Sequence, residues 1–231
     1  MIFGVLVIAT IAAFWVAQRL KHGPSIVQQL SFTPLLSPNG DGRHDAAAIG
    51  FLLARRERLT VQVIGPAPGV GVVATLVDRR STRAYRRVNL RWDGTSRIGA
   101  RVPDGRYKFV IRAGPKVIVV PRSVVVDTQP PAVRLTATAR SADRAEFRLV
   151  TPGRRRQLII YRRKHGSWTA FRRADRLAFG QTRIAVRPVG WPPGRYLLVA
   201  NARDVAGNVG YSTPVDEKRV PTTVAANLRT N

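Results

Sequence analysis

The sequence of 231 residues contains no cysteine, only three histidines and only 13 acidic residues. The absence of cysteine excludes disulfide bonds, thiolate metal sites and cysteine nucleophiles, and it leaves the redox compartment open. None of the motifs G-x-S-x-G, P-loop or H-E-x-x-H occurs, and the acidic residues are scattered without a pair that their spacing would bring together. We therefore expect no catalytic residues and no enzymatic activity.

Positive charge, in contrast, is abundant. The formal net charge is +26, and the 39 basic residues are 34 Arg and five Lys in a chain that is also rich in Ala, Val, Gly and Pro. These are residues of GC-rich codons, and the basic ones are spread out apart from short runs such as Arg154-Arg155-Arg156 and Arg162-Arg163-Lys164. We expect no specific nucleic-acid function. A general affinity for anionic wall polymers or lipid head groups follows from the summed field.

The N-terminus carries one uncharged apolar run, Met1–Ala17. As a helix it would be about 26 Å long, at the short end of what spans a bilayer. Trp15 lies near its end and Arg19 and Lys21 follow, as at a membrane interface. No basic segment precedes the run, so a cleaved signal peptide fits poorly. We predict an uncleaved transmembrane anchor at 1–20 and a juxtamembrane linker at 21–31, with a buried core helix as the alternative.

Beyond Pro24 the pattern changes to short runs of Val, Ile, Leu, Thr and Tyr between turn residues, with alternation at Leu59, Val61 and Val63. A period of two predicts antiparallel strands. Pro130-Pro131 interrupts the series, because proline gives no backbone donor to a central strand. Each half has about the size of one immunoglobulin-like sandwich. The predicted fold is all-β, two tandem immunoglobulin-like β-sandwiches after one transmembrane helix, with domains at 32–127 and 128–220 and a tail at 221–231.

The segment "SPNGDGRHD", residues 37–45, looks like a calcium loop. In an EF-hand register Gly42 takes the sixth position, but the first position is Ser37 and the twelfth is Ala48 where a bidentate Glu is expected. A high-affinity EF-type site is therefore not expected. Two interpretations stay open: a weak calcium site of other geometry, the one cofactor considered, or a compact turn folded on its own amides. Both use Asn39, Asp41 and Asp45.

The first half resembles the immunoglobulin-like domain of the bacterial flagellar hook-capping protein family over residues 32–127. The matching segments are "FTPLLSPNGDGRHD" (32–45), with His44 where the family has Asn, "AIGFLLARRERLTVQVI" (48–64) and "NLRWDGTSRIGARVPDGRYKFVIRA" (89–113). The middle hairpin matches only loosely. Asp93-Gly94 and Asp104-Gly105 are turn dipeptides, and we predict that Trp92 and Tyr107 are core aromatics.

The second half resembles, more weakly, the bacterial immunoglobulin-like and fibronectin-like repeats of surface proteins. The matching segments are "DTQPPAV" at the entry and "GRYLLVANARDVAGN" (194–208) near the exit. Here Tyr196 is expected in the core. Asp204, Gly207 and Asn208 are expected to build a tight turn, with Asp204 accepting hydrogen bonds from local amides.

These resemblances imply a non-enzymatic, membrane-anchored protein that acts in surface display, adhesion or structural assembly and binds a protein or an anionic cell-wall polymer. The rival hypothesis is an electrostatic binder of wall polymers, lipid head groups or nucleic acid. Membrane orientation is contested: Arg19 and Lys21 favour a cytoplasmic C-terminal side, whereas both halves resemble surface modules. We predict that residues 24–231 lie outside the membrane.

Overall fold

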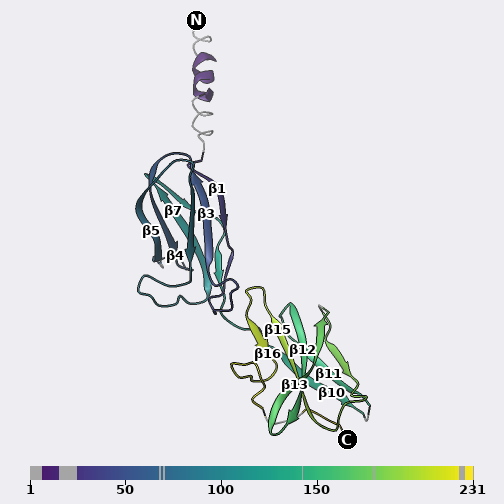
Figure 1. The fold of residues 1–231 in the computed structure, drawn as a ribbon. Helices are drawn as coiled ribbons and strands as arrows, with labels where there is room; N and C mark the ends of the chain where they lie inside the picture. The colour runs from purple at the N-terminus through teal and green to yellow at the C-terminus, as the bar shows by residue number, and fades with distance from the viewer. Residues whose placement is uncertain are drawn as a thin grey trace. The chain divides into compact units, whose positions relative to one another are not determined.

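The computed structural model describes residues 7–15, 25–67, 69, 71–141, 143–178, 180–223 and 227–230. A helix covers residues 7–15, and the regular structure after it consists of strands (Figure 1). Among these described residues, no helix has both the length and the apolar character needed to cross a membrane. Of the predicted anchor, residues 1–6 and 16–20 lie outside the described residues, as do residues 21–24 of the predicted linker.

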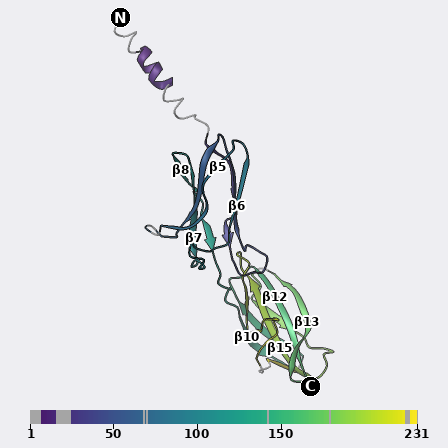
Figure 2. The same ribbon diagram turned by 60° about the vertical axis from the view of Figure 1, so that its left-hand side comes forward.

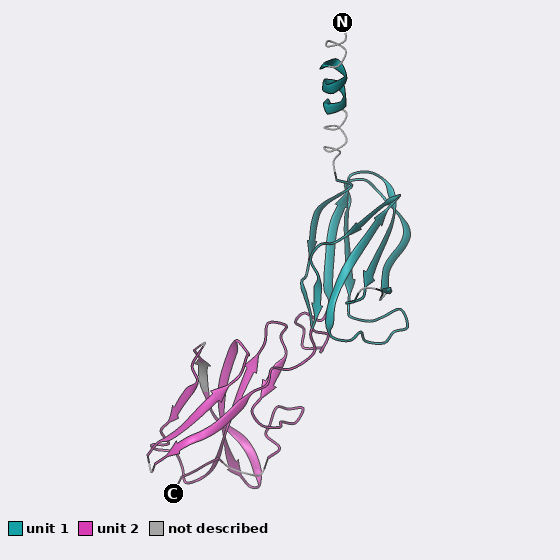
Figure 3. Ribbon diagram, turned by 180° about the vertical axis from the view of Figure 1, so that it is seen from behind, with its two compact units in different colours: residues 1–36, 46–126 teal, residues 37–45, 127–231 magenta. Residues whose placement is uncertain are grey.

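The chain divides into two compact units (Figure 3). Unit 1 comprises residues 1–36 and 46–126, and unit 2 comprises residues 37–45 and 127–231. The loop 37–45 therefore belongs to unit 2, although the strands that flank it in sequence belong to unit 1.

Unit 1 is built of two sheets. The smaller sheet has the order β1 (Val27–Phe32), β3 (Ala47–Leu53) and β6 (Arg87–Trp92). The larger sheet has the order β2 (Leu35–Leu36), β9 (Val124–Val126), β7 (Gly105–Ala113), β4 (Glu57–Ile64) and β5 (Val72–Thr82), and β8 (Lys116–Val119) pairs with β7. Figure 2 labels β5, β7 and β8 of this sheet. The short β2 runs parallel to β9, whereas the other pairs are antiparallel.

The core of unit 1 follows from alternation. Side chains of successive strand residues point to opposite faces, so Leu59, Val61 and Val63 of β4 all face inward and are buried. Phe51 of β3 and Phe109 of β7 join them from the two sheets in one hydrophobic cluster. Burying each such side chain stabilises the fold by about 1.5–3 kcal/mol. Unit 1 is therefore a sandwich closed by side chains of both sheets.

Unit 2 repeats the two-sheet plan. One sheet has the order β10 (Arg134–Arg140), β11 (Ala145–Val150) and β14 (Arg183–Val186). The other has the order β13 (Ser167–Leu177), β12 (Arg155–Lys164), β15 (Gly194–Arg203) and β16 (Val209–Tyr211), with β17 (Leu228–Thr230) paired to β15. Phe147, Leu158 and Leu198 lie in the cluster between the sheets. The coarse prediction of an all-β protein with two β-sandwiches is thus confirmed.

The outer face of the larger sheet in unit 2 carries a second cluster. Tyr161 of β12, Trp168 of β13 and Leu197 of β15 are buried there, with Val220 packed against them. The Tyr161 hydroxyl donates to the Arg219 carbonyl, and the Trp168 indole N–H donates to the Thr223 carbonyl. The segment after β16 therefore covers this face of the sheet.

Three boundaries differ from the sequence-based ones. Residues 37–45 join unit 2 because their side chains bond to it, so they are not part of the first domain. The predicted linker 21–31 includes all of β1 except its last residue, Phe32, and both Val27 of β1 and Ile26 before it are buried. The predicted tail 221–231 includes β17, whose Leu228 lies in the core of unit 2. Both end segments supply apolar side chains that a sandwich can bury.

Each unit has a tyrosine at the start of a central strand whose hydroxyl bonds back to a proline carbonyl four residues earlier. Tyr107 donates to Pro103 at 2.8 Å, and Tyr196 donates to Pro192 at 2.5 Å. The two rings are buried almost completely. This arrangement is the tyrosine corner found in immunoglobulin-like sandwiches, and it fixes the loop that leads into the strand.

We expect Tyr107→Phe to destabilise unit 1 and Tyr196→Phe to destabilise unit 2, each by about 1 kcal/mol, because each change removes one hydroxyl bond and leaves a proline carbonyl without its donor. Differential scanning calorimetry of the full chain measures this. Tyr85→Phe is the control, since Tyr85 is 69% exposed. Unfolding of both variants at the wild-type temperature would contradict the role of these corners.

Candidate functional site

The loop of residues 37–45 is folded by its own carboxylates. Asp45 accepts from the amide of Gly40 at 2.8 Å and, through its other oxygen, from the amide of Gly42 at 2.7 Å. The Asn39 side-chain oxygen accepts from the amide of Asp41, and Asp41 Oδ1 accepts from the amide of Arg43. The carboxylates thus bind backbone N–H groups, as in Asx-type turns.

The backbone of this loop explains its glycines. Gly40 and Gly42 have φ of 78° and 79°, in the left-handed region that residues with a Cβ adopt only at a cost. His44 has φ of 55° in the same region, which Asn and His tolerate better than most residues. His44 occupies the position where the resembling family has Asn.

The loop is held in unit 2 by the buried side chain of Asn208. The Asn208 carboxamide oxygen accepts from the Ser37 hydroxyl at 2.6 Å and from the Asn39 amide at 3.2 Å. Its nitrogen donates to the Asp127 carbonyl at 2.9 Å and to Asp204 at 3.1 Å. Ser37 and Asn208 are only 0% and 2% exposed. Three segments distant in sequence therefore meet at one amide.

The turn that presents Asn208 depends on Asp204. Its Oδ1 accepts from the amides of Gly207 at 2.7 Å and Asn208 at 2.9 Å. Gly207 has φ of 105°. The three residues that the sequence assigned to a turn thus lie together, between β15 and β16.

An ion pair adds to this network. Arg203 donates from one nitrogen to Asp41 at 2.9 Å and to the Gly207 carbonyl at 2.6 Å. Burial opposes ionisation of Asp41, but the hydrogen bonds from Arg203 and from the Arg43 amide, together with both arginine charges, hold its pKa below the usual value. Asp41 is therefore ionised whenever the pair is formed.

The metal interpretation of Asn39, Asp41 and Asp45 can be set against this geometry. Asp45 is engaged by two amides, and Asp41 by an amide and a guanidinium. In the part of the chain that the structure describes, no group of three or more His, Asp or Glu side chains is arranged to hold a metal ion. A calcium ion would have to displace donors that already satisfy these oxygens.

A basic pocket lies beside this network in unit 2. Its volume is about 190 Å³, and arginines line it from four segments: Arg43 of the loop, Arg155 of β12, Arg203 of β15 and Arg219 after β16. Among the described residues that line it, none is acidic, and Asn201 and Tyr211 complete the polar wall. Such a convergence of guanidinium groups favours an anionic ligand.

The run Arg154-Arg155-Arg156 places its members differently, because strand residues alternate between faces. Arg155 is exposed at the pocket, whereas Arg156 is buried. The Arg156 guanidinium donates to the carbonyls of Thr151, Gly153 and Gln181. Arg156 therefore holds the loop before β12, and Arg155 is available to a ligand.

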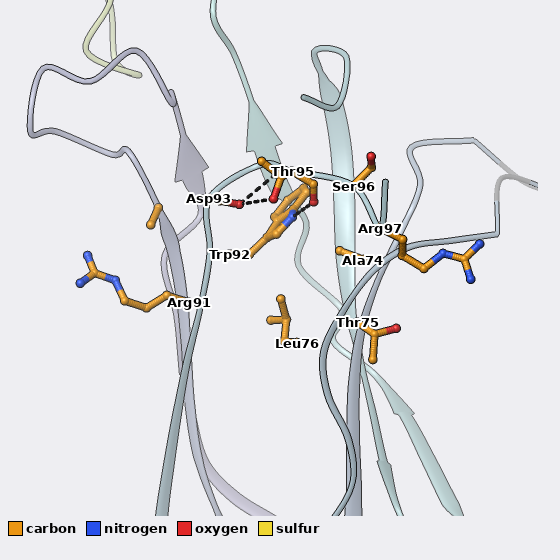
Figure 4. A pocket seen from close by; sticks show the side chains of 10 residues that line it. Ala74, Thr75, Leu76, Arg91, Trp92, Asp93, Thr95, Ser96 and Arg97 are labelled. Carbon is orange, nitrogen blue, oxygen red and sulfur yellow. Dashed lines mark hydrogen bonds between the residues drawn. The ribbon is translucent and has the colours of Figure 1, made fainter. Parts of the chain in front are cut away.

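Unit 1 has a separate pocket of about 600 Å³ around Trp92 (Figure 4). The indole N–H of Trp92 donates to the Thr95 carbonyl, and Trp92 packs against Tyr107 with ring centroids 5.2 Å apart. Asp93 accepts hydrogen bonds from the hydroxyl and the amide of Thr95. Both bonds lower the pKa of Asp93, and the bond from the hydroxyl has the larger effect. Trp92 and Asp93 therefore serve the turn and the core.

The remaining predicted residues lie in the loop after β6 and at the two corners. Gly94, after β6, has φ of 81°, Asp104 precedes β7, and Gly105 is the first residue of β7, two positions before Tyr107. Tyr196 packs against Trp191 and Phe171, with ring centroids 4.9 and 5.3 Å away. None of these residues faces the basic pocket.

Sequence reasoning missed Arg43, Arg203 and Arg219 as members of one site. Each is one arginine among 34, and their positions in the chain give no sign that they meet. The short run at 154–156 was the available signal, since a run that enters a strand must expose at least one of its members.

Comparison with known proteins gives only distant similarity. No family model matches the sequence, and no curated protein matches it. Among solved structures, the ligand-binding domain of human OSCAR has 13% identity and a TM-score of 0.33, over 78% of this chain and 92% of that one.

Two further structures are similar at the same level. The chicken CNTN1 domains FN1–FN3 have 12% identity and a TM-score of 0.31, over 78% of this chain and 65% of that one. The BSP domain of a biofilm-associated protein has 13% identity and a TM-score of 0.28, over 87% of this chain and 30% of that one. The similarity concerns the fold only, and the resemblance to the hook-capping type stays a prediction.

Asn208→Ala should destabilise unit 2 by about 3 kcal/mol, because it leaves several buried polar groups without partners. Chemical denaturation of the full chain measures the loss, and amide hydrogen exchange at Gly40 and Gly42 should accelerate as the loop is released. Asn89→Ala, at an exposed site of unit 1, is the matched control. A loss no larger than the control's would show that the network does not hold the loop.

Asp41→Asn tests the ion pair through pH. The folded-state pKa of Asp41 is lowered, so its contribution is full above the unfolded value near 3.8 and disappears as the pH falls through the folded pKa. At pH 7 the free energy of unfolding of the wild type should exceed that of the variant by up to about 1 kcal/mol, because the ion pair is partly solvated. In strong acid the two free energies should be equal. Unfolding at several pH values measures this difference.

The same pair of proteins separates the turn from the calcium hypothesis. If the loop is only a turn, the stability difference between the wild type and Asp41→Asn should be identical in millimolar calcium and in a chelator. Stabilisation of the wild type alone by calcium would establish a metal site at this loop.

Proposed function

We propose that the chain is a non-enzymatic, membrane-anchored protein whose two sandwiches act outside the membrane in surface display, adhesion or structural assembly. The observation that carries this proposal is that the polar residues around Asn208 form hydrogen bonds within the protein. Side chains that could have formed a reactive cluster bond instead to one another and to backbone amides. The most elaborate polar network of unit 2 thus supports a rigid module.

The fold is consistent with such a role. Each unit has its own hydrophobic core and its own tyrosine corner. Modules of this kind serve as spacers and as recognition surfaces, although fold alone does not determine function. The finer assignment of unit 1 to the hook-capping type rests on the ordered motifs of residues 32–113.

The anchor and the orientation rest on the sequence. The apolar run at 1–17 contains Trp15 near its end and is followed by Arg19 and Lys21, as at a membrane interface. Positive charge after the span argues for a cytoplasmic location of the domains, but the charge rule weakens for long translocated segments. We propose the external location because both halves resemble surface modules.

Protease treatment of cells stripped of their wall tests the location. Added protease should degrade residues 24–231 while a cytoplasmic control protein stays intact, and the fragment that remains should sediment with the membrane. Full protection of the domains until lysis would reverse the orientation. Recovery of the intact protein in the soluble fraction would contradict the proposed membrane anchor.

A second candidate function, binding of an anionic polymer, is favoured by the basic pocket of unit 2. The two functions are compatible, since a displayed module needs a partner.

A further inference from the structure

The basic pocket of unit 2 combines several cations, and the Asp41 carboxylate compensates part of their charge through its ion pair with Arg203 and its electrostatic interaction with Arg43. Of the arginines that line it, Arg43, Arg155 and Arg219 are exposed and take part in none of the three ion pairs of the described residues. Arg203 shares one nitrogen between Asp41 and the Gly207 carbonyl. The charge that faces the pocket is therefore strongly positive, and an anion that enters it meets donors from several directions.

The arrangement of these donors favours a tetrahedral oxyanion. A planar carboxylate is satisfied by the fork of one arginine, whereas a phosphate group presents oxygens in several directions. Here the guanidinium groups come from four segments around a space of about 190 Å³. This volume admits a phosphate group together with a small organic substituent.

The pocket adjoins a larger groove on the outer face of the β12–β15 sheet. The groove has a volume of about 660 Å³ and shares Gln157, Asn201, Tyr211 and Arg219 with the pocket. Lys218 and Arg173 line its other parts. Several cations that line one groove suit a chain that carries repeated anionic groups.

The aromatic residues of the groove argue against nucleic acid. Binding of single strands relies on exposed rings on which bases stack. Of the three aromatic residues that line the groove, Trp168 and Tyr161 are only 7% and 5% exposed and donate their N–H or O–H to backbone carbonyls, and Tyr211 is half-buried. The groove therefore offers cations and amide groups, with few ring faces for a base.

We propose that this pocket binds a phosphate group of a phosphodiester-linked polyol polymer, whose chain follows the groove toward Lys218. The inference names a partner for the proposed function and rests on it only for access to such a polymer. Binding is measured on purified protein, so its failure is distinguishable from failure of the location experiment.

The experiment uses the full chain in a non-ionic detergent and poly(glycerol phosphate) as the probe, followed by isothermal titration calorimetry. Arg155→Gln combined with Arg219→Gln should weaken binding about tenfold or more, because two charge-assisted contacts are lost. The control is Arg134→Gln combined with Arg187→Gln, which removes the same charge from exposed positions of unit 2 outside the pocket. The control should change binding less than about twofold. Equal weakening by both pairs would overturn the site, because the affinity would then belong to the field of the whole protein.

Other probes separate the sources of the anion. Poly-glutamate of matched length should bind much more weakly; equal binding would overturn the preference for phosphate. Tighter binding of single-stranded DNA that is lost in the pocket variant would replace the polyol polymer by nucleic acid. Binding of phosphatidylglycerol vesicles in preference to the soluble polymer would replace it by a membrane surface.

A measurement on the wild type guards against misfolding of the variants. Arginine modification by phenylglyoxal, mapped by mass spectrometry, should be slowed by the polymer at Arg43, Arg155 and Arg219. Modification of Arg134 and Arg187 should be unchanged. Uniform protection of all five, or protection of none, would overturn the proposal.

Discussion

The carboxamide of Asn208 is fully used: its oxygen accepts two hydrogen bonds and its nitrogen donates two. A buried amide that lost one partner would cost free energy, so all its partners are held to the same geometry. One partner is Ser37, and through it the whole loop 37–45 takes its place in unit 2. Because Arg43 belongs to that loop, the basic pocket also depends on this amide. The basic pocket, whose lining is mostly cationic, is thus held in place partly by a neutral, buried carboxamide.

The surplus of arginine has more than one use in this protein. Arg156 is buried and donates three hydrogen bonds to backbone carbonyls, so it stabilises the fold. Arg203 is divided between a carboxylate and a carbonyl, while its neighbour in space, Arg155, stays exposed. Net charge alone therefore overstates how many arginines a ligand can meet. The positions where several exposed ones converge carry the information about function.

Local patterns in the sequence were enough to predict the strands and the coarse fold. Alternation at Leu59, Val61 and Val63 puts three side chains on one face, and each is buried as the period requires. Contacts between distant segments were out of reach. Ser37 and Asn208 are 171 residues apart, and nothing in either neighbourhood indicates the other. The strand at Leu228–Thr230 is equally hidden, since three residues are too few for a period to show.

One repeated signal was available and carries physical meaning. The segments "PDGRY" at 103–107 and "PPGRY" at 192–196 both end in the tyrosine of a corner, and in both the first residue supplies the accepting carbonyl. Such a spacing of four can be read from sequence alone because the bond is local. It marks the start of the same central strand in each sandwich, β7 and β15. The pocket is marked locally only by the short arginine run at 154–156, because its other arginines come from distant segments.

The loop 37–45 shows why composition suggested calcium and geometry does not require it. In a calcium loop the carboxylates turn inward and converge on a cation. Here the backbone amides of Gly40 and Gly42 converge on the carboxylate of Asp45 instead.

The left-handed glycines are compatible with both a calcium loop and this turn, since each needs a tight turn with closely spaced polar groups. What separates the two designs is the partner of the carboxylates, and Arg203 supplies the positive charge that an ion would otherwise bring. A cation at this loop would compete with that guanidinium. The same loop that resembles a calcium site thus contributes, through Arg43, to a pocket of opposite preference.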